Sequence, residues 1–322
     1  MKFLIPVLPI FLGFLLDALL GDPYRLPHPI RLIGKLIAAL DKSVRIRNKF
    51  QNLKIAGFCI HFVVFWLTVG VSAFLVMLGH EIHPVLGIAV ESVLCYYMLA
   101  ARCLRNESEK VRKCAAKGDI EGARKAVSMI VGRDTAVLDE AGILRAAVET
   151  VAENTSDGVT APLFYMAFCG GVGACAYKAA NTMDSMLGYQ NETYRDIGFF
   201  PAKFDDVVNY IPSRLTALLM IVAAFLCGFD GKNAWRIWRR DRRNHASPNS
   251  AQTEAVCAGA LGLRLAGDAW YFGELHKKPY IGDDLRPIEP EDIRRANRLM
   301  YVTSCLCLLL CCAVRALIGG LL

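Results

Sequence analysis

The chain has 322 residues, of which 54% are hydrophobic and 21% are charged, a balance that excludes a disordered or low-complexity protein and is too apolar for an ordinary soluble domain. Its net charge of +7 comes from Lys and Arg residues that lie almost entirely between apolar runs, without the basic and aromatic pattern of a nucleic-acid module. We therefore expect a multi-pass membrane protein that contacts membrane lipid and binds no nucleic acid.

Six apolar runs, most of them near the roughly 20 residues that a bilayer core requires, follow one another along the chain. They cover residues 3–20, 55–78, 84–101, 159–180, 211–229 and 300–322. The sequence thus predicts an all-α membrane protein in which residues 1–322 form one integral membrane domain. The fourth run contains Gly170, Gly171 and Gly173, so it is either a spanning helix or a re-entrant segment.

The distribution of Lys and Arg predicts the topology. The loops at 21–54, 102–158 and 230–299 are rich in Lys and Arg, whereas residues 181–210 contain few. The positive-inside rule places the three basic loops in the cytoplasm and both termini outside. The fourth and fifth runs must both cross the membrane or both fail to cross, because only an even number of crossings keeps the last basic loop inside.

The loop at 102–158 is expected to form cytoplasmic helices. Asp119 can cap a helix that runs towards Gly132, and Asp134 or Thr135 can cap the next one. The basic loop at 230–299 is expected to be helical as well.

Glu149, Glu153 and Asp157 recur every four residues and would share one helix face. Such a stripe is either a solvated face or a site for a divalent cation or a phosphate group. The second interpretation gains weight because the stripe leads straight into an apolar run without Lys or Arg partners beside it.

A second polar cluster contains Asp184, followed by Asp205, Asp206 and Asn209. Adjacent aspartates point apart on a helix, so Asp205 and Asp206 cannot both serve one simple site, whereas Asp205 and Asn209 share a face. Arg214 lies just inside an apolar run, where its guanidinium either pairs with an anion or reaches the membrane surface.

The third polar cluster runs from residue 241 to residue 250. Ser247-Pro248-Asn249 interrupts a basic helix close to Arg242 and offers hydroxyl, amide and backbone donors. This segment is either an anion-binding cradle or a capped turn between two helices. Two further polar residues, His61 and Glu91, lie within apolar runs and suggest either a functional pair or an interhelical hydrogen bond.

Taken together, these clusters resemble the adenosylcobinamide-phosphate synthase family, and the similarity extends through most of the chain. The segments that carry it, in chain order, are Gly21-Asp22-Pro23 with Pro27-His28-Pro29, Gly132-Arg133-Asp134-Thr135, Glu153-Asn154-Thr155-Ser156-Asp157-Gly158, Asn181-Thr182-Met183-Asp184-Ser185-Met186, Asp205-Asp206-Val207-Val208-Asn209-Tyr210-Ile211-Pro212 and His245-Ala246-Ser247-Pro248-Asn249. The usual nucleotide, zinc and hydrolase signatures are missing from the sequence, so ATP phosphates would have to be held by another device.

The resemblance implies a ligase of cobalamin biosynthesis. With ATP and Mg²⁺, such an enzyme joins adenosylcobyric acid, a corrinoid, to aminopropanol phosphate or ethanolamine phosphate through an amide bond, by way of an acyl phosphate. It implies the cytoplasmic membrane of a prokaryote, with the active site at the cytoplasmic face. A soluble enzyme that produces the amino-alcohol phosphate is a candidate partner, and the oligomeric state is left open.

Site roles are assigned within that resemblance. The expected magnesium ligands are Glu153, Asp157, Asp184 and Asp205. The expected catalytic residues are Asp184, Asp205, Asp206 and His245, the last as acceptor of the ammonium proton. The expected substrate and phosphate ligands are Arg133, Asn154, Lys203, Asn209, Arg214, Arg242, Ser247 and Asn249.

Two other functions remain open from the sequence. Polar residues within spans also line substrate pathways, so the chain could be a transporter, although no inverted repeat is detected. A membrane signalling relative without catalysis is the second alternative. A cytoplasmic site conflicts with an external loop at 181–210, so either this loop folds back into the membrane or the fourth and fifth runs are both re-entrant.

Overall fold

The computed structural model describes residues 4–23, 27–47, 52–189 and 191–321, which form two compact units. The first unit comprises Met1–Ala100, Ala161–Asn209 and Leu308–Leu322, and the second comprises Ala101–Thr160 and Tyr210–Cys307. Helices dominate both units, which confirms the all-α class. The description of residues 1–322 as one integral membrane domain stays a prediction.

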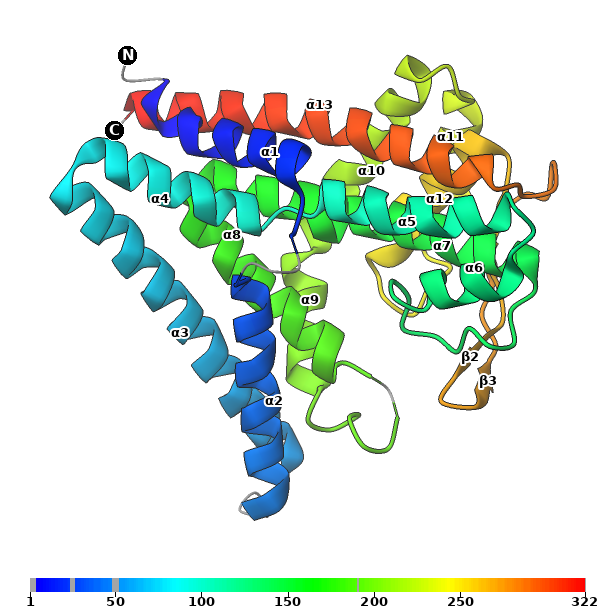
Figure 1. Cartoon of the computed structure of the whole chain (residues 1–322), viewed down its shortest axis with the longest axis horizontal. Helices are drawn as coiled ribbons and strands as arrows, with labels where there is room; N and C mark the ends of the chain where they lie inside the picture. Colours follow the sequence, from blue (N-terminus) through cyan, green and yellow to red (C-terminus); the bar gives the residue numbers. More distant parts are fainter. Residues whose placement is uncertain (1–3, 24–26, 48–51, 190, 322) are drawn as a thin grey trace. The chain divides into compact units, whose positions relative to one another are not determined.

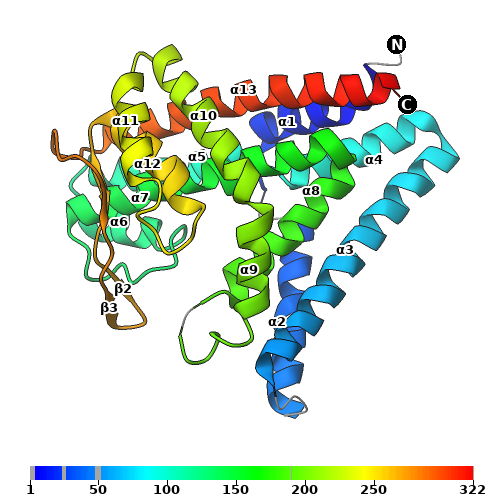
Figure 2. The same cartoon turned by 180° about the vertical axis from the view of Figure 1, so that it is seen from behind.

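The first unit is a bundle of helices, most of them apolar (Figure 1, Figure 2). Its elements are η1 (Ile5–Val7), α1 (Leu8–Leu20), α2 (Pro29–Arg47), α3 (Leu53–Ile82), α4 (Pro84–Tyr97), α8 (Ala161–Leu187), α9 (Phe199–Val208) and the end of α13 (Glu291–Leu321). α3 and α4 form a hairpin at His83, whose Nδ1 accepts the N–H of Val85 at 3.2 Å, and Pro84 supplies the fixed φ of a first helical residue.

Helix α8 is broken near its middle. Cys169 and Gly170 leave helical geometry, and Gly170 has φ +59° and ψ −153°, a conformation that is essentially restricted to glycine. Side chains satisfy the backbone groups on both sides of the break. Glu91 Oε1 accepts the N–H of Gly171 at 3.0 Å, and Arg315 Nη1 donates to the carbonyl of Phe168 at 3.2 Å. The glycine-rich fourth run is therefore an interrupted helix.

Of the two interpretations of His61 and Glu91, the functional pair is wrong, whereas an interhelical hydrogen bond is confirmed for Glu91, between α4 and α8. Glu91 caps the break in α8, whereas His61 is buried among the rings of Phe65, Phe200 and Phe204, and neither of its ring nitrogens has a hydrogen-bond partner. Both are polar residues within apolar helices, but His61 on α3 and Glu91 on α4 contact different neighbours.

The second unit contains shorter helices and two small sheets. Its elements are α5 (Ala101–Ala115), α6 (Ile120–Val127), α7 (Glu140–Thr155), the π-helical turn η2 (Ser156–Thr160), α10 (Tyr210–Leu226), α11 (Gly231–Asp241), α12 (Ser250–Leu261), β1 (Arg264–Ala266), β2 (Ala269–Tyr271), β3 (Glu274–His276), β4 (Tyr280–Gly282) and most of α13. β1 pairs with β4 and β2 with β3, both antiparallel. The sequence interpretation missed these strands, because three residues are too few to show an alternating pattern.

The loop at 102–158 confirms one predicted cap and corrects the other. Asp119 caps α6, accepting the N–H of Gly122 at 2.9 Å, but this helix ends at Val127. The next helix, α7, begins only at Glu140 and is capped by Asp139 rather than by Asp134 or Thr135. The carboxylate of Asp134 instead accepts the N–H of Gly273 at 2.8 Å, in the turn between β2 and β3.

Four helical stretches are long and apolar enough to cross a membrane, within the residues that the structure describes. They are Leu53–Ile82, Pro84–Ala115, Glu140–Leu187 and Glu291–Gly320, and α9 with α10 forms a fifth candidate bent by 46°. The six-segment count is not confirmed, because Ile5–Leu20 is shorter and the fifth run is only part of that bent pair.

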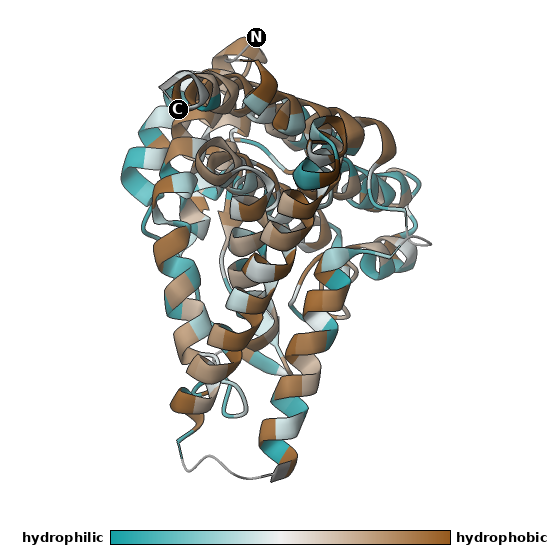
Figure 3. Cartoon of the chain, turned by 90° about the vertical axis from the view of Figure 1, so that its left-hand side faces the viewer, coloured by the Kyte–Doolittle hydropathy of each residue, from teal (hydrophilic) through white to brown (hydrophobic). Residues whose placement is uncertain are grey.

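The surface of α3 explains why a bilayer suits the first unit. Phe62, Trp66, Phe74 and Met77 are each more than half exposed, and apolar residues predominate along the helices in Figure 3. Exposed apolar side chains in such number would aggregate in water, whereas lipid tails cover them without cost. The chain is therefore built as a multi-pass membrane protein.

Candidate functional site

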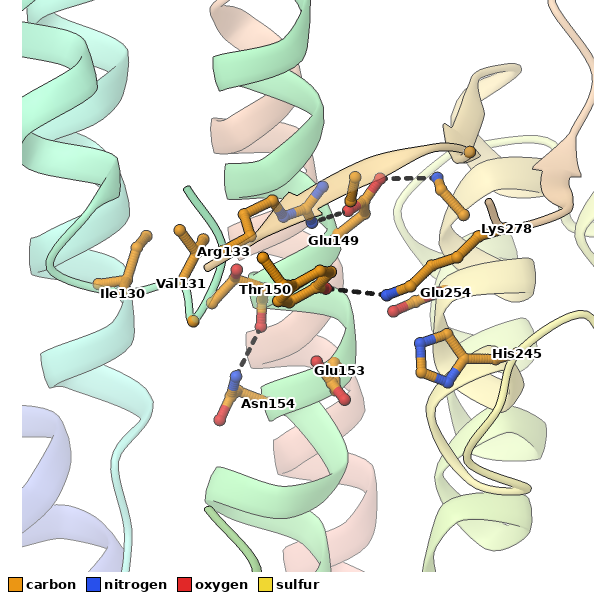
Figure 4. A pocket seen from close by; sticks show the side chains of 15 residues that line it. Ile130, Val131, Arg133, Glu149, Thr150, Glu153, Asn154, His245, Glu254 and Lys278 are labelled. Atoms are coloured by element: carbon orange, nitrogen blue, oxygen red, sulfur yellow. Dashed lines mark hydrogen bonds and ion pairs between the residues drawn. The ribbon is translucent and has the colours of Figure 1, made fainter. Parts of the chain in front are cut away.

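A polar cavity of about 130 Å³ lies within the second unit (Figure 4). Residues from α7, α12, two strands and four loops line it: Ile130, Val131, Gly132, Arg133, Glu149, Thr150, Glu153, Asn154, His245, Glu254, Ala266, Gly267, Ala269, Tyr271 and Lys278. Four of the sequence-predicted site residues, Arg133, Glu153, Asn154 and His245, meet here.

Glu149 ties three segments of the cavity wall together. Its Oε2 accepts a hydrogen bond from Arg133 Nη2, and its Oε1 accepts the backbone N–H of Ala266 at 2.6 Å. Burial by itself would lower the pKa of Arg133, but the charge and hydrogen bond of Glu149 outweigh it and raise that pKa. Arg133 therefore stays cationic, and Ala266 is held at φ +58°, an uncommon conformation for a residue with a Cβ.

Glu153 and Asn154 lie one turn further along α7. Ser250, the first residue of α12, donates from Oγ to Glu153 Oε1 at 2.7 Å, and Asn154 Nδ2 donates to the carbonyl of Thr150 at 3.0 Å. Asp157, in η2, is not among the lining residues. A π-turn adds a residue to the helical repeat, so the stripe of Glu149, Glu153 and Asp157 loses its common face at this point.

The sequence interpretation missed Lys278 and Tyr271. Lys278 Nζ donates to the hydroxyl of Tyr271 at 2.8 Å and lies 4.6 Å from the centre of the same ring. Tyr271 ends β2, and Lys278 lies between β3 and β4, so both reach the cavity only because the strands pair. Nothing local in the sequence distinguishes Lys278 from its neighbour Lys277.

Glu254 and His245 face the same acidic surroundings. Burial, reinforced by the negative charges of Glu153 and Glu149, raises the pKa of the Glu254 carboxyl well above its usual range. Burial also lowers the pKa of His245, an effect that Glu153 opposes. The cavity thus favours a neutral imidazole, which can accept a proton, beside carboxyl groups that repel one another.

The segment around Ser247-Pro248-Asn249 joins the start of α10. Arg214 Nη1 donates to Asn249 Oδ1 at 3.0 Å and Nη2 donates to the carbonyl of Pro248 at 3.2 Å. Asn249 N–H donates to Ser247 Oγ at 3.2 Å, and Ser247 N–H donates to His245 Nδ1 at 3.0 Å. The structure brings these four predicted residues together, in a chain of hydrogen bonds that ends in the cavity.

Arg242 lies near this segment and stacks over Trp238, with its guanidinium carbon 4.7 Å from the ring centre. The carbonyl of Arg242 accepts from Gln252 Nε2 at 3.1 Å, which links the end of α11 to α12. Arg242 is not among the residues that line the cavity.

The remaining predicted residues belong to the first unit. Asp205 accepts hydrogen bonds from Asn209 at 2.9 Å and Asn181 at 3.5 Å, whereas Asp206 pairs with Lys203 at 3.0 Å. The expectation that Asp205 shares a face with Asn209 while Asp206 points elsewhere is confirmed. Asp184 lies in the last turn of α8, upstream of this cluster.

The predicted magnesium ligands divide between the units, Asp184 and Asp205 in the first and Glu153 and Asp157 in the second. Among the residues that the structure describes, no three His, Cys, Asp or Glu side chains form a group that could hold a metal ion by themselves. Mg²⁺ commonly needs only one or two protein carboxylates when it is bound together with substrate phosphates. The proposed set stays a prediction.

The fold defines a multi-pass helical membrane protein with a small, highly charged cavity. The sequence model of the family described as "CobD/Cbib protein" matches residues 10–300. The cobalamin biosynthesis protein CobD of Clostridium perfringens is 47% identical over 312 residues, which cover 97% of this chain and 99% of that protein.

Two further relatives show similar agreement. The CobD protein of Geobacter metallireducens is 48% identical over 92% of both chains, and the cobalamin biosynthesis protein CbiB of Salmonella typhimurium is 46% identical over 96% of this chain and 97% of its own. No solved structure matches. The chain belongs to the CobD/CbiB family, the adenosylcobinamide-phosphate synthase family that its motifs resemble.

Proposed function

We propose that this protein acts in cobalamin biosynthesis as an ATP- and Mg²⁺-dependent amide ligase, which joins adenosylcobyric acid to aminopropanol phosphate or ethanolamine phosphate. Membership of the family supports the pathway, since the curated relatives are named cobalamin biosynthesis proteins. The observation that carries the chemistry is the cavity in which Arg133, Glu153, Asn154 and His245 converge, because it combines cationic, acidic and basic groups in one small space.

A carboxylate is a poor electrophile and needs activation. In the proposed reaction a corrinoid carboxylate oxygen attacks the γ-phosphorus of ATP, which forms an acyl phosphate and releases ADP. The amine nitrogen then attacks the acyl carbon, and inorganic phosphate leaves. The ammonium must lose its proton before it attacks, and the neutral imidazole of His245 is suited to accept it.

Glu153 is the protein group that best fits magnesium within this cavity. It is a carboxylate on a rigid helix, held in place by Ser250, and it has no Lys or Arg ion-pair partner among the described residues. The ion would neutralise phosphate charge when bound together with ATP. Two arginines would add positive charge for the phosphate groups. Arg133 lines the cavity, and Arg214 is hydrogen-bonded to the segment at 247–249 that leads to His245.

The decisive experiment uses the purified protein in lipid nanodiscs. It is given adenosylcobyric acid, Mg²⁺-ATP and either aminopropanol phosphate or ethanolamine phosphate, and the amide is detected by mass spectrometry. We expect product with one ADP per amide bond, and the faster amine identifies the substrate. Absence of product from folded protein, even after a soluble cell extract is added, would overturn the proposal.

Two further experiments test the finer parts of the proposal. An acyl phosphate requires that ¹⁸O from labelled corrinoid carboxylate appears in the released phosphate. A site at the cytoplasmic face that includes residues 181–210 requires that Asn191→Cys, in a background without other thiols, resists an impermeant maleimide in intact cells. Labelling of this cysteine from outside would remove that loop from a cytoplasmic site.

A further inference from the structure

Lys278 is fixed in place although it is a long and flexible side chain. Its backbone N–H donates to Asp268 Oδ1 at 3.2 Å, its Nζ donates to the Tyr271 hydroxyl at 2.8 Å, and the ammonium lies against the Tyr271 ring. Ordering such a side chain costs rotamer entropy, so a fixed lysine at a cavity wall is pre-organised to bind.

The charge of Lys278 is not neutralised by an ion pair. Arg133, the other strong cation of the cavity, is bound to Glu149. Lys278 makes no salt bridge with a carboxylate among the described residues, although three glutamates line the same cavity, and it offers a phosphate group both its own donors and the adjacent Tyr271 hydroxyl.

The carboxyl of Glu254, in the acidic part of the cavity, lacks a hydrogen-bond donor among the described residues. Glu254 is 5% exposed and receives no hydrogen bond from any described residue, while Glu153 is held by Ser250. Figure 4 shows the Glu254 carboxyl between Lys278 and His245, turned to the cavity. Arg133 and Lys278 act on Glu254 through space but donate no hydrogen bond to it. A bound ammonium group would provide the donors that this buried carboxyl lacks.

The size of the cavity restricts its ligand. A volume of about 130 Å³ is well below the roughly 300–1,000 Å³ of pockets that enclose drug-sized molecules. A nucleotide or a corrinoid ring cannot be enclosed here, whereas a short molecule with an ammonium at one end and a phosphate at the other matches the volume and both charges.

We propose that Lys278 and Glu254 bind the two ends of the amino-alcohol phosphate, Lys278 with Tyr271 at the phosphate and Glu254 at the ammonium. This assignment rests on the proposed ligation for the identity of the substrate. It adds residues that determine specificity. The corrinoid and the nucleotide lie outside this cavity, except for the corrinoid carboxylate and the ATP phosphate that would bind with magnesium at Glu153.

A crossed inhibition experiment tests the two ends separately. Ethyl phosphate carries only the phosphate end of the substrate, and ethanolamine carries only the ammonium end. We expect Lys278→Met to raise the inhibition constant of ethyl phosphate about tenfold to hundredfold, the effect of one lost charge-assisted hydrogen bond, and to leave that of ethanolamine unchanged. Glu254→Gln should show the reverse pattern, and both variants should raise KM for the complete substrate.

Matched variants separate binding from folding. Lys277→Met removes the exposed neighbouring lysine and should leave all constants as in the wild type. Lys278→Arg should restore most of the affinity for ethyl phosphate, and Tyr271→Phe should weaken it less than Lys278→Met does. Gel filtration and thermal unfolding identify any variant that fails to fold.

Direct binding distinguishes failure of this assignment from failure of the proposed function. Calorimetry with ethanolamine phosphate, without ATP or corrinoid, should show binding to wild type and loss of binding in Lys278→Met. If the protein forms the amide but Lys278→Met and Glu254→Gln keep wild-type constants, the assignment is wrong and the ligase stands. If no amide forms, the proposed function fails, and absence of calorimetric binding then rejects the assignment as well.

Discussion

Arg133 and Glu149 form a part-buried ion pair that joins the loop before α7 to the helix itself, and the same carboxylate receives the N–H of Ala266 from β1. Removing Glu149 leaves a mostly buried guanidinium without its partner and an amide without its acceptor. We expect Glu149→Ala to lower the free energy of unfolding by at most about 3–5 kcal/mol, the range for broken pairs that are fully buried. Thermal and denaturant unfolding in detergent measure the loss.

The exposed pair of Glu121 and Arg124 provides the comparison. Glu121 is largely solvent-exposed, so Glu121→Ala should change the free energy of unfolding by less than about 1 kcal/mol. Equal losses in Glu149→Ala and Glu121→Ala would contradict a special role for the buried pair.

Ionisation of Glu254 should make the unliganded protein less stable as the pH rises. Its pKa in the folded chain lies above the ordinary value of 4.5, so between these two values the folded state binds more protons than the unfolded state, and the free energy of unfolding falls with increasing pH. Glu254→Gln cannot ionise. Its Tm relative to wild type should therefore increase as the pH is raised above 4.5.

Glu274, which is exposed on β3, supplies the control for that experiment. Glu274→Gln makes the same chemical change at a solvent-exposed position, so the difference between the two variants isolates the effect of burial. A Tm difference between Glu254→Gln and wild type that does not change with pH would show that the Glu254 carboxyl does not ionise at a cost to the fold.

In the proposed reaction, protonation of His245 causes the loss of activity at low pH. Burial lowers its pKa below 6.5, so the imidazole remains unprotonated, and able to accept a proton, at pH values somewhat below 6.5. The profile of kcat/KM against pH should fall on the acidic side only below 6.5. His245→Gln should reduce kcat by about 10²–10⁴ and abolish this limb; a limb that persists in His245→Gln belongs to another group.

The acidic residues of the first unit are expected to be essential for turnover. Asp205→Asn and Asp184→Asn should abolish amide formation while the protein still inserts into the membrane, which membrane fractionation and gel filtration can establish. Glu192→Gln, a change at an exposed position of the same unit, should behave as wild type. Near-normal rates in either aspartate variant would remove that residue from the site.

Gly170 should tolerate no side chain. Its φ of +59° and ψ of −153° exclude residues with a Cβ, and a Cβ at this position would collide with Glu91 Oε1. We expect Gly170→Ala to cost at least about 1–3 kcal/mol of stability. Gly70→Ala is the matched change, since a Cβ there meets nothing within 4 Å and α3 continues through it. A similar Tm for the two variants would contradict the geometry of the break.

The long apolar helices could be predicted because their signal is local. Leu53–Ile82 is one uninterrupted apolar stretch, and the cap at Asp119 follows from a side chain three residues before the N–H that it accepts. The start of α7 could not be predicted in the same way. Asp134 has the right residue type for a cap, but a strand turn 139 residues away takes its carboxylate.

The same distinction holds for the site. Glu153 and Asn154 belong to one compact polar motif, and His245 begins a second one that continues to Asn249. Both motifs are visible in the sequence. Lys278 and Tyr271 reach the cavity through strand pairing, which no residue pattern of three positions reveals. The prediction that Asp157 shares a helix face with Glu149 and Glu153 is wrong, because Asp157 lies in a π-turn. Such a turn rotates the following side chains around the helix axis, and the residue spacing in the sequence does not reveal it.

The broken helix α8 also imposes an order on biogenesis. The carbonyl of Phe168 receives its donor from Arg315, which the ribosome adds 147 residues after Phe168. Until the final helix has been synthesised and inserted, one half of the break lacks this donor, while Glu91 is already present for the other half. A nascent chain therefore holds an incomplete segment in the bilayer for much of its synthesis, and truncation before Arg315 should expose it to membrane quality-control proteases.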